Sequence, residues 1–308
     1  MKTLKKVLAV VLALAMVLGM AVTASAYTDD AAITYDEAVK VMSLAGVLDG
    51  YTDGSFKPAG TLTRAEAAKI IVYMLGLEDT SLGYKANFGD ISGHWAEEPI
   101  SVAAGLGILA GFPDGSFQPN GTLTGFQWAK ILLCAMGYDA EIEGLLGQKW
   151  EANTARLIKA TKMNKGIKAF DGSKAVTREE ACQMAYNVID EEFVGYPETG
   201  TTAVKLGSKY YSDKDAIFGE ADCFADRLNL KSTTAETDKW QRPITRWWIE
   251  SYGSEKTCST DKEKYVDVAA KAEVSYTEST KKNAIYADLD LDGTETFTLS
   301  ENGSKPVS

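Results

Sequence analysis

The sequence predicts an α+β fold, in which an all-α helical array of three repeats is followed by a small β-rich C-terminal domain. Three observations lead to this expectation. One segment occurs three times between residues 48 and 184. Each copy contains a Thr-x-x-Glu or Thr-x-x-Gln pattern that opens a helix, and after Glu192 the helical pattern gives way to Gly, Thr, Ser and aromatic residues. A segment that repeats down to its turn residues indicates copies of one supersecondary unit.

The first two copies match each other without a gap. They read LDGYTDGSFKPAGTLTRAEAAKI (48–70) and LAGFPDGSFQPNGTLTGFQWAKI (109–131), and 61 residues separate Thr63 from Thr124. The third copy reads KGIKAFDGSKAVTREEACQM (165–184). From Gly111 to Thr124 there are 13 residues, but from Gly166 to Thr177 there are 11. The loop of the third copy has therefore lost two residues.

The N-terminus has the pattern of a secretory signal peptide over residues 1–26. Three lysines precede an apolar run from Val7 to Ala21, and Ala24-Ser25-Ala26 provides small residues for cleavage after Ala26. A membrane anchor is the alternative, but the run is shorter than the ~20 residues that a spanning helix needs. We expect an exported, soluble mature chain with no membrane segment after cleavage.

The charge balance limits the classes of partner. The chain carries a net charge of −11, and loss of the three leader lysines leaves −14. Such an acidic surface argues against nucleic acid or anionic lipid as a non-specific partner. If the ligand is itself an acidic polymer, the attraction must come from a few placed cations.

The repeats resemble the S-layer homology (SLH) family. The second copy has the opening block NFGDISGHWAEEPI (87–100), and the first and third have the closing blocks TRAE (63–66) and TREE (177–180). The resemblance covers about residues 27–192 and divides them into a first repeat with a degenerate start (27–85), a second (86–142) and a third with a shortened loop (143–192). It implies a helical module that binds a secondary cell wall polysaccharide of Gram-positive type, through an acidic pyruvate ketal on an amino sugar.

The start of each second helix is predicted by a capping box, in which a Thr side chain and a Glu or Gln side chain satisfy the free helix amides reciprocally. The three boxes are Thr63 with Glu66, Thr124 with Gln127, and Thr177 with Glu180. The apolar residues that follow the first box, Ala67, Ile70, Ile71 and Met74, have helical spacing and are expected in the core.

Arg64 and Arg178 stand at the first helical position, where a cation is mildly unfavourable beside the helix dipole. Each is either a solvated arginine paired with a carboxylate or part of an anion site with the helix amides. Their repetition and the family resemblance favour the anion site. In the second copy Gly125 replaces the arginine, so the anion site of that copy lacks its cation. We therefore expect one or two functional binding sites rather than three.

Two tryptophans occupy matching positions near the start of the first helices. Trp95 and Trp150 are either core residues or groove residues that stack on a sugar, and the resemblance favours the groove. In the first copy Thr34 takes this position, and no F-x-D block precedes it. His94, the single histidine, is expected to cap or pack rather than to catalyse.

The Asp-Gly turns hold the remaining candidate residues for glycan binding, which are Gly50, Asp53, Gly111 and Asp114. Asp-Gly pairs supply the positive φ of a tight turn, and Phe56 and Phe117 read as apolar plugs beneath it. A structural role explains most of these residues. A glycine before the aromatic residue could also let a sugar approach the backbone closely.

The cysteines indicate no metal site and no cofactor. Cys134 and Cys182 lie in apolar helical patterns and are expected as small buried hydrophobes. Cys223 and Cys258 are the better pair for a disulfide in an exported chain, although their pairing cannot be read from the sequence.

The C-terminal region, residues 193–308, is expected to be β-rich. Residues 284–300 alternate in two arms about Asp292-Gly293, which predicts a hairpin. A calcium loop through Asp288, Asp290 and Asp292 is the alternative, but Leu299 replaces its bidentate Glu. Residues 242–253 read as a strand in which Trp247 and Trp248 face opposite sides. The sequence stops in mid-pattern, which is consistent with a truncated product.

These observations favour a secreted, non-catalytic cell-surface protein that is anchored to wall polysaccharide, as an S-layer or S-layer-associated subunit in contact with other subunits. A wall-anchored glycan hydrolase is the first alternative, since paired carboxylates suffice for such chemistry. Its candidate acids are Glu220, Asp222, Asp226 and Glu250. Repeats that serve only as a protein interaction scaffold are the second alternative.

Overall fold

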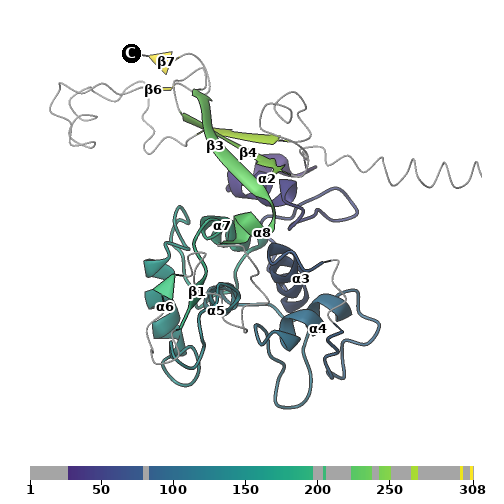
Figure 1. Cartoon of the computed structure of the whole chain (residues 1–308). Coiled ribbons are helices and arrows are strands. Elements are labelled where there is room, and N and C mark those ends of the chain that lie inside the picture. The colour runs from purple at the N-terminus through teal and green to yellow at the C-terminus, as the bar shows by residue number, and fades with distance from the viewer. Residues whose placement is uncertain are drawn as a thin grey trace, which may run out of the picture.

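The computed structural model (Figure 1) describes an α+β chain in which helices surround one core and a small antiparallel sheet lies against them, as the sequence predicts. The described residues are 27–78, 83–196, 204–205, 223–237, 243–250, 265–269, 299–300 and 306–307. The predicted signal peptide lies outside them. So do the turn and calcium acids of the predicted hairpin, together with Cys258, Glu220 and Asp222.

Each sequence copy contributes two helices. The first helices are α2 (Asp36–Leu44), α4 (Glu97–Gly105) and α6 (Trp150–Ala160), and the second helices are α3 (Arg64–Met74), α5 (Gly125–Ala135) and α7 (Arg178–Asn187). A 3-10 turn, η1 (Asp30–Ala32), precedes α2. The second helix of each copy packs on the first helix of the next: α3 on α4, α5 on α6, and α7 back on α2. The predicted array is therefore closed into a ring.

All three second helices begin with the predicted capping box. In each box the Thr side chain accepts a hydrogen bond from the N3 backbone amide, and the N3 side chain accepts one from the Thr amide. Two of the four free amides at each helix start are thus satisfied by the sequence motif itself. The helices begin one residue later, at Arg64, Gly125 and Arg178.

Backbone contacts close the ring at these helix starts. The amide of Arg64 donates to Gly121 O at 2.8 Å, that of Gly125 to Lys174 O at 2.9 Å, and that of Arg178 to Gly60 O at 2.7 Å. Three β-bridges accompany them: Thr63 with Thr122, Thr124 with Ala175, and Thr61 with Thr177. The first and third copies are therefore direct neighbours, although more than a hundred residues separate them in the chain.

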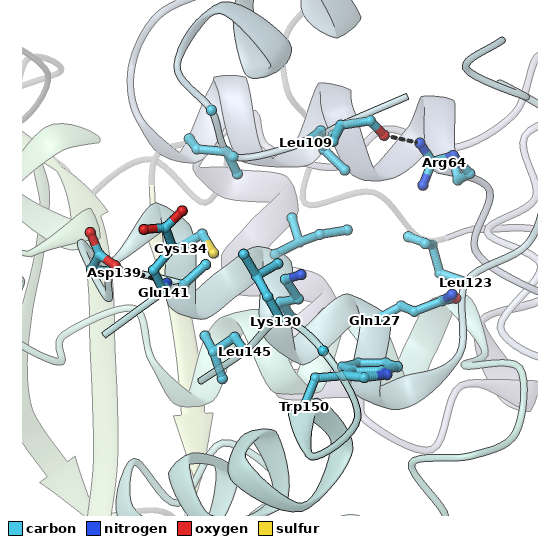
Figure 2. Close-up of a pocket in the computed structure, with 17 residues that line it drawn as sticks. Arg64, Leu109, Leu123, Gln127, Lys130, Cys134, Asp139, Glu141, Leu145 and Trp150 are labelled. Carbon is cyan, nitrogen blue, oxygen red and sulfur yellow. Dashed lines mark hydrogen bonds between the residues drawn. The ribbon is translucent and has the colours of Figure 1, made fainter. Parts of the chain in front are cut away.

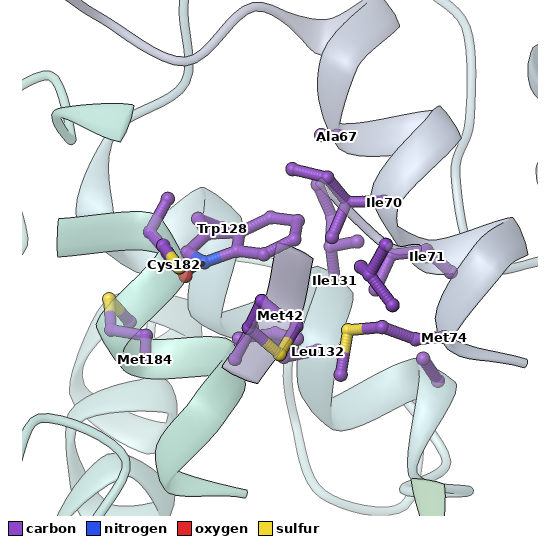
Figure 3. Close-up of a cluster of buried hydrophobic side chains, with 14 of the residues drawn as sticks. Met42, Ala67, Ile70, Ile71, Met74, Trp128, Ile131, Leu132, Cys182 and Met184 are labelled. Carbon is purple, nitrogen blue, oxygen red and sulfur yellow. Dashed lines mark hydrogen bonds between the residues drawn. The ribbon is translucent and has the colours of Figure 1, made fainter. Parts of the chain in front are cut away.

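The core lies where the second helices meet (Figure 3). Ile71 and Met74 of α3 face Leu132 of α5, and Met42 of α2 completes the cluster beside them. Trp128 is fully buried, and its indole N–H donates to Ala181 O at 3.1 Å, so that its polar atom is satisfied inside the core. The predicted core positions Ala67, Ile70, Ile71 and Met74 are all buried, and Cys182 is also buried, whereas Cys134 is half-buried.

The start of the first copy corrects the sequence interpretation. Tyr27-Thr28-Asp29 is the missing aromatic-x-Asp block, because Asp29 accepts from the amides of Phe56 and Lys57, both at 2.8 Å. Asp90 does the same in the second copy with Phe117 and Gln118, at 2.8 and 2.7 Å. The Tyr27 ring lies 5.3 Å from that of Phe56, as Phe88 lies from Phe117. Tyr for Phe and Thr for Gly concealed the block in the sequence.

The described C-terminal strands form small antiparallel sheets. The largest has the order β3 (Leu230–Thr237), β4 (Pro243–Ile249) and β5 (Tyr265–Ala269), and the short helix α8 (Phe224–Arg227) precedes it. Strand β4 confirms the strand predicted around Trp247, which is 6% exposed, while Trp248 is half-buried. The two-residue strands are β1 (Val194–Gly195) with β2 (Val204–Lys205), and β6 (Leu299–Ser300) with β7 (Pro306–Val307).

The three-stranded sheet shares its core with the helices. Trp247, Ile249 and Val266 belong to the same buried cluster as α2 and α7, and the Tyr186 and Trp247 rings meet edge-on at 5.9 Å. Phe193 and Phe224, 5.0 Å apart, link the end of the helical part to α8. The sheet therefore packs directly on α2 (Figure 1).

Candidate functional site

Two matching grooves lie between the helical copies. The first groove, of about 580 Å³, is lined by residues 47–52, Thr63, Glu66, Lys69, Ile70, Trp95, Asn120 and Arg178. The second groove, of about 620 Å³, is lined by residues 107–110, Leu123, Gln127, Lys130, Ile131, Cys134, residues 139–141 and 145–147, Trp150 and Arg64 (Figure 2). Many of these positions match across the 61-residue offset of the repeats, such as Lys69 with Lys130 and Ile70 with Ile131.

Each groove draws its side chains from all three copies. In the first groove, α3 supplies the floor, Arg178 comes from the start of α7, and Trp95 precedes α4. In the second groove, α5 supplies the floor, Arg64 comes from the start of α3, and Trp150 begins α6. The closed ring is what brings these residues together, so the grooves exist only in the folded assembly of copies.

The two predicted arginines lie in these grooves, but neither is a freely solvated side chain. Arg178 is 5% exposed; its Nε donates to Phe56 O at 2.9 Å, its Nη2 to Asp49 O at 3.4 Å, and its Nη1 binds Glu66 at 2.7 Å. Arg64 is half-buried and donates to Phe117 O at 2.8 Å and Ala110 O at 2.7 Å. Each guanidinium thus holds a neighbouring loop while one edge faces a groove.

Aromatic rings support both guanidinium groups. The Arg178 guanidinium carbon lies 4.6 Å from the Tyr51 ring centroid, and that of Arg64 lies 4.4 Å from Phe117. Burial lowers the pKa of Arg64 below its ordinary value, opposed by the nearby charge of Asp90. Arginine nevertheless stays protonated at neutral pH. Both grooves therefore contain a fixed cation.

The tryptophans line the grooves rather than fill the core. Trp95 is 60% exposed and Trp150 is half-buried. The Lys130 ammonium lies 6.0 Å from the Trp150 ring centroid. An exposed indole beside a cation provides a flat apolar face with polar groups next to it, which suits the surface of a sugar ring. His94 accepts a hydrogen bond from the Ala96 amide at 3.1 Å just before α4, and its ring lies 5.5 Å from that of Trp95.

Lys69 and Lys130 are groove residues that the sequence reasoning missed. Both lie on the exposed side of a second helix, at equivalent positions 61 residues apart. Their shared position in the repeat was the available signal. They were not predicted as binding residues because a single lysine on the surface of an amphipathic helix is usually only solvated.

The turn residues have contacts that explain them without a ligand. Asp53 accepts from the amide and hydroxyl of Ser55 at 3.0 and 2.6 Å, and Asp114 does so from Ser116 at 2.9 and 2.7 Å. These hydrogen bonds lower the pKa of Asp53 to about 2. Gly54 and Gly115 have φ of 79° and 83°, as the Asp-Gly pattern predicts.

Gly50 and Gly111 are required by packing. A Cβ on Gly50 would lie 2.7 Å from the Tyr27 ring, and one on Gly111 would lie 2.2 Å from the Phe88 ring. Gly50 also lines the first groove. The two glycines therefore bring the aromatic-x-Asp block onto the turn, and this close approach accounts for both of them.

The contact between the second and third copies lacks an arginine. Gly125 is buried, and a Cβ on it would lie 2.9 Å from the Phe170 ring. The Phe126 ring packs in the same way on Gly172, where a Cβ would lie 2.4 Å from it. Two phenylalanines thus replace the guanidinium, and the loop shortened by two residues fits around them. In the third copy Gln183 also stands where Lys69 and Lys130 stand.

The candidate acids of the hydrolase alternative that can be placed are Asp226 and Glu250. Both lie near Lys231, whose Nζ is 3.4 Å from Asp226 and 3.9 Å from Glu250. Cys223 donates to Asp226 from its thiol at 3.4 Å. Within the described residues, no group of three His, Cys, Asp or Glu side chains is arranged to hold a metal ion.

Two segments match the family model of the S-layer homology domain, residues 26–68 and 87–129. The chain is 34% identical over 47% of its length to a surface layer protein of Brevibacillus choshinensis and 25% identical over 99% of its length to an S-layer protein of Bacillus thuringiensis subsp. finitimus. It is also 32% identical over 44% of its length to an uncharacterized cell wall amidase of Bacillus anthracis. It spans 14%, 40% and 27%, respectively, of the lengths of these relatives.

These similarities support an SLH-domain protein of the cell surface and indicate a secreted location in the cell wall or S-layer. The matched segments contain the aromatic-x-Asp blocks, the Asp-Gly turns and the first two capping boxes. In the part of the chain that the structure describes, no helix has both the length and the apolar character needed to cross a bilayer.

Proposed function

We propose that the helical ring attaches this protein non-covalently to an acidic secondary cell wall polysaccharide, with the two grooves as the binding sites. The observation that carries the proposal is the repeated combination of an arginine, a lysine and a tryptophan in two grooves of about 600 Å³. Guanidinium and ammonium groups bind a sugar carboxylate, and the indole supplies apolar contact area. Attachment of this kind needs no bond-breaking step, and we propose a non-catalytic role as an S-layer or S-layer-associated subunit.

The third segment is proposed as a third repeat of the same family, over residues 143–192. Its Thr177–Glu180 capping box supports this assignment, as does the turn in which Asp171 accepts from the Ser173 hydroxyl at 2.6 Å. Its helices also contact the first and second copies in the same way as those copies contact each other. Its own groove position lacks the arginine and the lysine, so two binding sites are proposed rather than three.

The test is sedimentation with purified Gram-positive cell walls that carry pyruvylated polysaccharide. Lys69→Ala/Lys130→Ala removes one cation from each groove without touching the carbonyls that the arginines hold. Lys40→Ala/Lys85→Ala is the matched control, since it changes the net charge equally at exposed or half-exposed sites outside the grooves. We expect the groove variant to bind at least about tenfold more weakly and the control to bind like the wild type.

Treatment of the walls with mild acid, which removes ketal-linked pyruvate, tests the acidic sugar. Loss of wild-type binding after this treatment is the expected result. Equal binding before and after treatment would contradict recognition of an anion. No binding of the wild type to either wall preparation would favour a role of the repeats as a protein scaffold. Arg64→Ala and Arg178→Ala complete the series once circular dichroism shows that each variant folds.

A further inference from the structure

At two matched positions, the first groove has a carboxylate that the second lacks. The first groove has Asp49 where the second has Ala110, and Glu66 where the second has Gln127. The cations are the same type in both grooves. These two substitutions decide whether the arginine and the lysine meet a carboxylate at the matched positions.

In the first groove both cations are paired internally. The Arg178 guanidinium lies 2.7 Å from Glu66, and the Lys69 ammonium lies 2.7 Å from Asp49. The Tyr51 hydroxyl also donates to Glu66 at 2.8 Å. An anion entering this groove would have to displace Glu66 from a guanidinium that is 5% exposed and would approach Asp49 at the same time. Both steps oppose binding of a negative charge.

In the second groove the same cations have no such partners. Arg64 donates to two neutral carbonyls, those of Phe117 and Ala110. Among the residues described, the ion pairs include neither Arg64 nor Lys130. Asp139 and Glu141 line this groove too, but they lie beside Cys134 at the end away from Arg64 (Figure 2). Asp139 there accepts from the amides of Glu141 and Ile142, at 2.8 and 2.9 Å.

Carboxylates behind the grooves do not cancel this asymmetry. Asp90 lies near Arg64, and its counterpart Asp29 binds the equivalent loop beside the Arg178 site through the same pair of amide hydrogen bonds. Both grooves thus have this background charge in common. At the arginine and the lysine themselves, the grooves differ in charge through Asp49 against Ala110 and Glu66 against Gln127.

We infer that the two grooves take different sugars: the second groove accepts the anionic residue of the polysaccharide, and the first accepts a neutral one. This inference rests on the proposed function and assigns its two sites separate ligand classes. Two sites of different specificity on one ring would bind a polymer that contains both acidic and neutral sugars in one direction. The neutralised first groove then contributes stacking on Trp95, and the second contributes the charge contact.

A reciprocal exchange tests the inference. Ala110→Asp/Gln127→Glu gives the second groove the carboxylates of the first, and Asp49→Ala/Glu66→Gln does the reverse. Both exchanges keep the capping boxes, because Glu and Gln already serve at the equivalent N3 positions. Circular dichroism and thermal unfolding establish that each variant is folded before binding is measured.

The readout is ¹⁹F NMR of protein labelled with 5-fluorotryptophan, with the Trp95 and Trp150 resonances assigned by Trp→Phe variants. The probes are the methyl glycoside of an N-acetylhexosamine bearing a pyruvate ketal and the same glycoside without the ketal. We expect the acidic probe to shift Trp150 in the wild type at concentrations about tenfold lower than those that shift Trp95. The second-groove exchange should remove this preference, and the first-groove exchange should give Trp95 a comparable response.

Equal titration of Trp95 and Trp150 by the acidic probe in the wild type would overturn the inference, as would a first response at Trp95. A wild type that binds walls through pyruvate but shows either result would leave the proposed function standing while the division between the grooves fails. A wild type that binds neither walls nor probe would overturn both.

Discussion

At the scale of single residues, the turns of the first two copies depend on glycines that admit an aromatic ring. Gly111 lies beneath Phe88, which in turn packs 5.3 Å from the buried Phe117 ring. Asp90, two residues after Phe88, accepts from the amides that follow this turn. One missing Cβ therefore lets an aromatic ring and a carboxylate fix the same loop. The contact is structural, although the same loop carries the residues that line a groove.

Gly111→Ala tests this packing. The added Cβ would lie 2.2 Å from the Phe88 ring and 2.8 Å from Ser116 O, so the ring or the turn must move. We expect a loss of about 1–3 kcal/mol in the free energy of unfolding, measured by urea denaturation. Gly89→Ala is the matched control, because a Cβ there meets nothing within 4 Å and its φ is not in the left-handed region. An equal loss in both variants would show that backbone conformation, not the ring, decides the effect.

At the scale of elements, the sequence predicted what local chemistry determines. The capping boxes located the starts of α3, α5 and α7, and the helical spacing of Ile70, Ile71 and Met74 identified the buried face of α3. The strand around Trp247 followed from composition and alternation in the same way. These features depend on residues a few positions apart in the chain, and sequence patterns predict structure well over such short separations.

The partners of the groove residues depend on contacts between distant segments and could not be read from a pattern. Arg178 meets Glu66 across 112 residues, and it holds the Phe56 carbonyl across 122. A helix-start arginine in the sequence is compatible with an open anion site or with a buried ion pair. Only the closed ring distinguishes the two. The groove lysines were missed for a related reason. Lys69 is recognised as a binding residue only because Trp95 and Asp49, which are distant in the sequence, line the same groove.

The capping box of α5 gives a prediction for one element. Thr124→Ala removes the side-chain acceptor for the Gln127 amide, and we expect a loss of about 0.5–2 kcal/mol in the free energy of unfolding. Thr124→Ser keeps the hydroxyl and should lose much less. Thermal unfolding followed at 222 nm compares the two. If serine costs as much as alanine, the methyl group of Thr124 stabilises the helix start and the cap does not.

At the scale of the whole molecule, the ring is closed by a junction between the first and third copies that contains a half-buried carboxylate. Burial raises the pKa of Glu66, but the hydrogen bond from the Thr63 amide and the charge of Arg178 together lower it below the ordinary 4.5. A carboxyl group with a lowered pKa in the folded state stabilises the fold above its unfolded pKa, and this stability is lost as the pH falls. Acid should therefore weaken the ring at this junction.

The turn carboxylates act in the same direction. Hydrogen bonds from backbone amides lower the pKa of Asp29 and Asp90, and those from serines lower the pKa of Asp114 and Asp171. Each of these groups is protonated more readily in the unfolded chain, where its pKa is near 3.8. The contribution of these carboxylates to the stability of the ring should thus be constant above about pH 5 and fall steadily below about pH 4.5.

Glu66→Gln separates the junction from the turns. At pH 7 we expect this variant to be less stable than the wild type by about 1–3 kcal/mol, because the amide replaces a charged partner of Arg178. As the pH falls below the ordinary pKa of 4.5, the wild type loses the stability that its lowered Glu66 pKa provides, so the difference should shrink while both proteins lose the turn contributions. Urea denaturation at pH 7, 5, 4 and 3 measures both effects. A difference that stays constant over this range would mean that the charge of Glu66 does not stabilise the junction, and that Arg178 closes the ring through the Phe56 and Asp49 carbonyls alone.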